Sequence, residues 1–119
     1  FVSPGQITIT RRNLEALSGL AHQGVHTTSD NALAISSSDI VIIALKPYNV
    51  REVIGALRDQ FDARRHVVIS VVTGIFINEL SAILPEGVPL FRAMPNTAIA
   101  IQESVTCICH QHASEAHVG

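Results

Sequence analysis

Five consecutive apolar residues, from Ile40 to Ala44, constrain the fold of this chain more than any other stretch of its sequence. Leu45 continues the run, and Lys46 and Pro47 end it. A short apolar run of this kind is typical of a strand buried on both faces in a parallel sheet. Because a proline keeps the residue before it extended, the chain should stay extended past the end of the strand. We therefore expect a doubly covered strand over residues 39–45.

The rest of the chain alternates between segments with strand character and segments with helical spacing of apolar residues. Further strands are expected over residues 7–10, 25–28, 67–72, 88–94 and 104–109. Helices are expected from Arg12 or Asn13 to a stop at Gly24, from an Asp30 N-cap through Ile35, and over residues 50–61, 77–84 and 113–117. This alternation predicts an α/β fold with a doubly wound, mostly parallel sheet.

Composition excludes several classes of function. With 119 residues, 47% hydrophobic and 15% charged, the chain can fill the core of one domain but not of two. Its net charge of -2 and the lack of a basic stripe argue against nucleic-acid binding. The apolar runs are too short to span a bilayer, and no secretory signal precedes them. We expect a cytoplasmic protein that binds neither membrane nor nucleic acid.

The cysteines and histidines do not predict a metal site. Zinc ligands are usually spaced as Cys-x2-4-Cys and His-x3-5-His, and the Cys107-x-Cys109 and His110-x-His112 pairs are too tight. Only His112 and His117 have a suitable gap, so these residues are better explained as alternating strand positions and no metal is expected. We take the two cysteines to be reduced thiols. The remaining histidines are expected at the surface or in loops: His22, His26 and His66.

Three motifs together resemble one enzyme family. The strand-like segment 90–94 ends in Arg-Ala-Met, and Pro95, Asn96 and Thr97 follow it. Residues 7–13 read Ile-Thr-Ile-Thr-Arg-Arg-Asn, and residues 40–47 read Ile-Val-Ile-Ile-Ala-Leu-Lys-Pro. In order and spacing these segments resemble the central part of the NADP-binding, Rossmann-like domain of Δ1-pyrroline-5-carboxylate reductase. The resemblance implies an oxidoreductase of proline biosynthesis that uses NADPH to reduce this cyclic imine to proline.

The end of the strand expected over residues 7–10 should meet the adenosine ribose of the cofactor. In a dinucleotide-binding fold an acidic residue there selects NAD, whereas cations and hydroxyls accommodate the 2′-phosphate of NADP. This chain offers Thr10, Arg11 and Arg12, with no acid until Glu15. Guanidinium groups match phosphate oxygens in charge and geometry. The alternative interpretation is an exposed basic pair at the start of a helix.

The resemblance assigns the other cofactor contacts by position. Asn31 corresponds to a residue that reaches the ribose and phosphate region, although Asp30 beside it could simply cap a helix. The resemblance places Ala44, Leu45, Lys46 and Pro47 against the nicotinamide half of the cofactor. Val72 also falls at the nicotinamide, where the family prefers smaller residues, so this position is a departure from the pattern.

Asn96 and Thr97 are expected to line the catalytic crevice. They follow a buried strand at its carboxyl end, where open α/β sheets bind ligands. The alternative is a capped turn that uses the same side chains on backbone groups.

The family's Gly-x-Gly-x-x-Gly turn, its first strand and its C-terminal helical domain have no counterpart in the sequence. We therefore interpret residues 1–119 as part of a dinucleotide-binding domain lacking its first strand, inactive alone, from a parent that is a homo-oligomer. Two other functions stay open. One is a dehydrogenase of the same superfamily, of the β-hydroxyacid or prephenate type. The other is a non-catalytic ligand-binding fragment.

Overall fold

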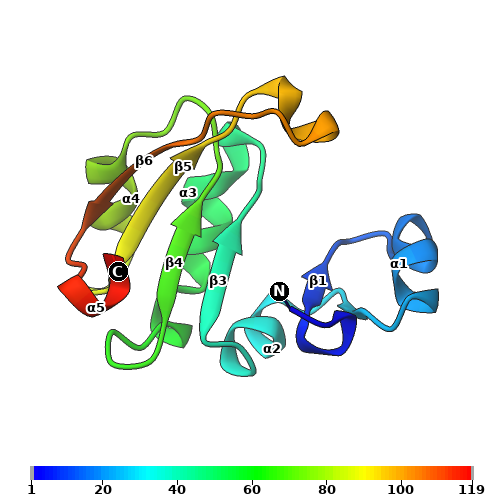
Figure 1. The fold of residues 1–119 in the computed structure, drawn as a ribbon. Coiled ribbons are helices and arrows are strands. Elements are labelled where there is room, and N and C mark those ends of the chain that lie inside the picture. The colour runs from blue at the N-terminus through cyan, green and yellow to red at the C-terminus, as the bar shows by residue number, and fades with distance from the viewer. Residues whose placement is uncertain (1, 119) are drawn as a thin grey trace. The chain divides into compact units, whose positions relative to one another are not determined.

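A computed structural model describes residues 2–118 and shows an α/β fold (Figure 1). The chain separates into two compact units, with the boundary between Ser38 and Asp39. Backbone pairing follows the same division, because strands β1 and β2 form one sheet and strands β3 to β6 form another. None of the helices in the described part is both long and apolar enough to cross a membrane.

The first unit is a parallel pair of strands with short helices. Its elements are η1 (Pro4–Gln6), β1 (Thr8–Thr10), η2 (Leu14–Leu17), α1 (Ser18–His22), β2 (His26–Thr28) and α2 (Asn31–Ser36). The expected Asp30 cap is present, since its Oδ1 accepts a hydrogen bond from the Leu33 amide at 3.1 Å. Gly24 follows α1 with a φ of 94°, a conformation that suits glycine at the end of a helix.

The second unit contains a four-stranded sheet in the order β3-β4-β5-β6. Its elements are β3 (Ile40–Ile43), α3 (Pro47–Ala56), η3 (Arg58–Gln60), β4 (Val67–Ser70), α4 (Ile77–Ile83), β5 (Leu90–Met94), η4 (Thr97–Ile101), β6 (Cys107–Gln111) and α5 (Glu115–Val118). The first three strands run parallel and β6 is antiparallel to β5. The expected α/β class with mostly parallel strands is confirmed.

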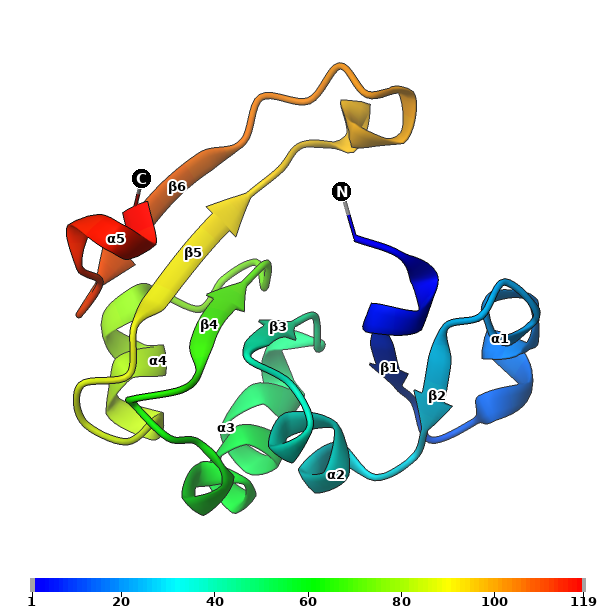
Figure 2. The ribbon, with the colours of Figure 1, turned by 60° about the horizontal axis from the view of Figure 1, so that its bottom comes forward.

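Helices α3 and α4 lie on the same face of this sheet and bury its core (Figure 2). Val50 of α3 and Leu80 of α4 are fully buried, as are Val68 and Leu90 on the central strands. The α3 helix starts earlier than expected, because Pro47 occupies its first turn. A proline fits there because the first helical amides have no partner inside the helix.

The prediction that the first apolar run is buried on both faces is wrong for the described chain. Ile40 and Ile42 on β3 are 60% and 61% exposed, whereas Ile43 is buried. The crossovers through α3 and α4 step across the sheet in the same direction, so right-handed connections place both helices on one face. The opposite face is an apolar groove to which Ile69, Phe91 and α5 contribute.

His66, expected at the surface or in a loop, does lie in a loop but is 3% exposed. Its Nδ1 accepts a hydrogen bond from the Asp62 amide at 2.8 Å, and its own amide donates to the Asp62 carbonyl at 2.8 Å. The ring packs edge-on against Phe61. The loop can bury this polar ring because it supplies a hydrogen bond to the ring nitrogen. Buried polar groups in proteins are generally hydrogen-bonded in this way.

Candidate functional site

The candidate residues of the second unit share one edge of the four-stranded sheet. β3, β4 and β5 run parallel, so their carboxyl ends meet there. Three segments follow these ends: residues 44–47, 71–74 and 95–97. This is the edge at which open α/β sheets bind ligands. The structure therefore brings together three groups of candidates that are far apart in sequence.

The segment after β3 presents a cation beside a helix start. Ala44, Lys46 and Pro47 are exposed and Leu45 is half-buried. Lys46 is extended (φ −67°, ψ 141°), and α3 begins directly after it without a side-chain cap. Within the described chain the Lys46 ammonium has no ion-pair partner. The Lys46 ammonium and the positive end of the dipole of this ten-residue helix, which has no side-chain cap, form an electropositive corner.

The segment after β4 is a tight turn with an inward-facing valine. Val72 is only 2% exposed, and its amide donates to Ser70 Oγ at 3.2 Å. Thr73 and Gly74 are exposed, and Gly74 has a φ of 80°. The Val72 side chain belongs to the core, so only its backbone can face a ligand at this edge.

The segment after β5 is held by Asn96. Its Oδ1 accepts from the Ala98 amide at 3.0 Å, and its own amide donates to Ser104 Oγ at 3.1 Å. The side-chain oxygen thus caps η4, as in the alternative interpretation given above. The Nδ2 donors have no partner among the described residues and the side chain is exposed. The Thr97 backbone begins η4, but its side chain lies outside what the structure describes.

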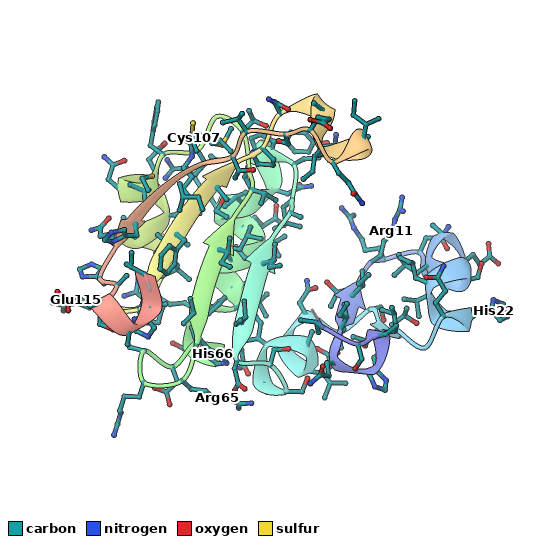
Figure 3. All side chains as sticks on the ribbon, viewed as in Figure 1. Arg11, His22, Arg65, His66, Cys107 and Glu115 are labelled. Atoms are coloured by element: carbon teal, nitrogen blue, oxygen red, sulfur yellow. The ribbon has the colours of Figure 1, made fainter. Side chains whose placement is uncertain are left out.

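The first unit has a corresponding edge after β1 and β2, which also run parallel. The Arg11 amide donates to the Thr28 carbonyl at 3.2 Å, which joins the two loops. Figure 3 shows the Arg11 side chain extending from the chain just past β1. The guanidinium groups of Arg11 and Arg12 are exposed and make no hydrogen bond or ion pair in the part of the chain described. Thr10 is half-buried at the end of the strand.

Asn31 stands in the first turn of α2 on this same edge and is half-buried. The capping role belongs to its neighbour Asp30. The Asn31 amide side chain has no hydrogen-bond partner among the described residues. It is therefore free to meet a ligand that lies over the start of the helix.

Ser104 is a site residue that sequence reasoning missed. Its hydroxyl fixes the Asn96 backbone from eight positions along the chain. A serine in a loop belongs to no helical or strand pattern in the sequence. Its hydrogen bond to Asn96 therefore could not be predicted without the fold.

A family model described as NADP oxidoreductase, coenzyme F420-dependent, matches residues 1–74. Pyrroline-5-carboxylate reductase 1 of Dictyostelium discoideum is 38% identical over 103 residues, covering 87% of this chain and 18% of that protein. Pyrroline-5-carboxylate reductase 2 of the same organism is 39% identical over 109 residues, covering 89% and 36%. The chain therefore spans well under half the length of these curated relatives.

Solved structures agree with the sequence comparison. A pyrroline-5-carboxylate reductase from Coxiella burnetii superposes with a TM-score of 0.88 at 29% identity, over 95% of this chain and 43% of that one. The NADP-bound pyrroline carboxylate reductase of Plasmodium falciparum matches with a TM-score of 0.71 at 20% identity, over 80% and 36%, which supports the fold alone. The resemblance to these reductases expected from the three motifs is confirmed.

Proposed function

The chain belongs to the family of NADP oxidoreductases described as coenzyme F420-dependent, and from this premise we propose that a protein carrying it reduces Δ1-pyrroline-5-carboxylate to proline with NADPH. The observation that carries the proposal is the gathering of residues 44–47 and Asn96 at one carboxyl edge of the parallel sheet. The curated relatives named above, all pyrroline-5-carboxylate reductases, support the choice of substrate.

The two arginines after β1 are proposed to select NADPH. Asn13, which could compete for a ligand there, is committed to the turn, because its Oδ1 accepts from the Glu15 amide at 3.0 Å. Arg11 and Arg12 remain as exposed, unpaired cations at the strand end. Two guanidinium forks next to the Thr10 hydroxyl suit a phosphate ester and leave no carboxylate at the strand end to hold a ribose diol.

The edge of the second unit is proposed to hold the reacting half of the cofactor and the imine. NADPH would supply the hydride that the C=N carbon accepts. The backbone of residues 44–46, which is extended at Lys46, can lie along the nicotinamide, with Lys46 and the start of α3 favouring nearby negative charge. The Asn96 Nδ2 donors can orient the substrate, because its Oδ1 and backbone amide are already fixed. These residues bind and orient, and none of them is assigned as a proton donor.

Substrate specificity can be tested with the full-length protein that carries this chain. The purified protein is supplied with NADPH and Δ1-pyrroline-5-carboxylate, and separately with NADP and a β-hydroxy acid or prephenate. We expect the protein to turn over the cyclic imine and neither of the other two substrates. Turnover of a hydroxy acid or of prephenate without the imine would establish one of the dehydrogenase alternatives. Binding of NADPH without turnover of any substrate would indicate a ligand-binding protein.

The setting of the parent protein forms part of the same proposal. Residues 1–119 are taken as part of its dinucleotide-binding domain. Cys107 and Cys109 are free thiols, which fits a reducing compartment such as the cytoplasm. The exposed apolar groove beside β3 favours association of the parent into a homo-oligomer. The net charge of -2 of the 119-residue chain argues against a nucleic-acid partner for this part of the protein.

A further inference from the structure

All three sulfur-containing side chains of the sequence lie in one small area of the fold. The chain has two cysteines and one methionine, which are Cys107, Cys109 and Met94. In the β5–β6 ladder Met94 pairs with Cys107, and Arg92 pairs with Cys109. Directly paired antiparallel residues point to the same side of a sheet, as do residues two apart on one strand. The three sulfur side chains therefore share one face.

That face is the one covered by α4, opposite the apolar groove. Phe91, Ile108 and His110, which alternate with the sulfur residues, line the groove on the other side. The Arg92 guanidinium lies 5.6 Å from the ring centre of Phe76, the residue that precedes α4. Both cysteines are exposed, so α4 leaves their part of this face open to solvent; Cys107 is labelled in Figure 3.

The spacing of the thiols suits a shared ion better than a disulfide. Positions two apart on a strand are separated by about 6.7 Å. A disulfide brings its sulfur atoms to about 2 Å, and its Cα atoms are most often about 5.5–6 Å apart. With metal–sulfur bonds of about 2.3 Å, as for zinc, two sulfurs bound to one ion stand at most about 4.6 Å apart. Ordinary side-chain rotation from parallel strand positions can provide that separation.

The charge around the thiols also fits a cation held by two thiolates. A monovalent ion with two thiolates carries one net negative charge, which the adjacent Arg92 guanidinium balances. The Arg92 Nε is buried and has no hydrogen-bond partner among the residues that the structure describes. Its N–H would gain an acceptor in a metal-bound Cys109 thiolate.

We propose that Cys107, Cys109 and Met94 form a binding site for Cu(I). Thiolate and thioether sulfur are the ligands that select this soft ion. A structural zinc site is usually closed by four Cys, His or acidic ligands, and no cluster of even three such residues exists in the described chain. Binding would replace the proton of each thiol with the shared ion and release both protons. The proposal does not depend on the reductase activity.

The site can be tested on the reduced chain under inert gas, with Cu(I) supplied by a chromophoric bicinchoninate complex. One ion per chain is expected, with a first coordination sphere of sulfur alone by X-ray absorption. Losing an outer-sphere partner typically weakens metal binding 10–100-fold. Cys107→Ser and Cys109→Ser should therefore each lower the affinity by roughly 100-fold or more, and Met94→Leu by about tenfold.

His110→Gln is the matched control, because His110 is on the same strand but on the opposite face. The affinity of the His110→Gln variant for Cu(I) should equal that of the unsubstituted 119-residue chain. Excess zinc should not displace Cu(I) from either chain. The proposal is overturned if the cysteine variants bind normally while folded by circular dichroism. It is overturned equally if His110→Gln loses as much affinity, or if nitrogen or oxygen dominates the coordination sphere.

Discussion

The backbone amide of Asn96 donates a hydrogen bond to the Ser104 hydroxyl oxygen across 3.1 Å and so joins the two ends of the loop that contains η4. The Asn96 side-chain oxygen holds the same loop from inside through the Ala98 amide. The residue is thus fixed at two points, and only its Nδ2 donors remain for another partner. Structural and ligand-binding roles can therefore be separated at a single side chain.

Asn96→Asp in the full-length protein should keep the fold and lose most of the turnover. Aspartate retains an oxygen to accept from Ala98 but has no Nδ2 donors. Asn96→Ala, the control, loses both functions and should also lower the free energy of unfolding by about 1 kcal/mol. A misplaced substrate can cost about 100-fold in rate. Thermal midpoints and turnover numbers of both variants distinguish a ligand-binding role of Asn96 from a structural one. Near-normal turnover of the Asp variant would show that Asn96 is only structural.

Replacing Arg11 and Arg12 with Ala in the full-length protein should raise the Michaelis constant for NADPH but not for NADH. A charge-assisted hydrogen bond to phosphate is worth about 1.5–3 kcal/mol, so the change should be at least about tenfold. Arg64→Ala removes an exposed cation from a different loop and serves as the control for net charge. Equal effects on both cofactors would mean that the arginine pair is only a solvated start of η2.

The sequence predicted those features that depend on neighbours along the chain. Asp30 precedes an apolar helical pattern, and its oxygen does cap the Leu33 amide. The strand at Ile40–Ile43 and the turn at Gly24 also follow from local composition. Local hydrogen bonds and backbone preferences act within a few residues, so a pattern can reveal them without knowledge of the fold.

The directions of side chains and the covering of the sheet could not be predicted in the same way. Residues 67–69 and 71–72 are all apolar, so apolar and polar positions do not alternate along this strand. The sequence therefore does not show that Val68, Ser70 and Val72 face the core. The run at residues 40–44 indicates that burial is favourable but not which elements supply it. Ser104 and His66 acquire their roles through contacts that only the folded backbone creates.

His66→Ala should destabilise the second unit more than its position in a loop suggests. The change removes the buried ring that accepts from the Asp62 amide and packs edge-on against Phe61, and the lost hydrogen bond alone is worth about 0.5–1.5 kcal/mol. His22→Ala at the exposed end of α1 is the control, with an expected change within about 0.5 kcal/mol. Urea unfolding of both variants measures the difference, and equal midpoints would contradict the role given to the buried ring.

Gln102→Gly should stabilise the loop after η4. Gln102 adopts a left-handed conformation (φ 62°, ψ 25°), which costs a residue with a side chain about 1–2 kcal/mol. The greater freedom of glycine in the unfolded chain offsets part of this gain, leaving about 0.5 kcal/mol. Glu103→Gly has no such strain to relieve and should lower stability by about 0.4–1 kcal/mol. Denaturant unfolding should therefore shift in opposite directions for these neighbouring residues.

Two leucine-sized side chains on the same sheet should respond very differently to truncation. Leu90 on β5 is fully buried under the helices, so Leu90→Ala should cost about 2–5 kcal/mol. Ile42 on β3 is 61% exposed on the open face, so Ile42→Ala in the 119-residue chain should cost less than about 1 kcal/mol. Urea unfolding of the two variants gives the comparison. A cost at Ile42 close to that at Leu90 would show that this face is covered in solution, for instance by a second copy of the chain. In that case the cost should fall on dilution, because dissociation exposes the face again.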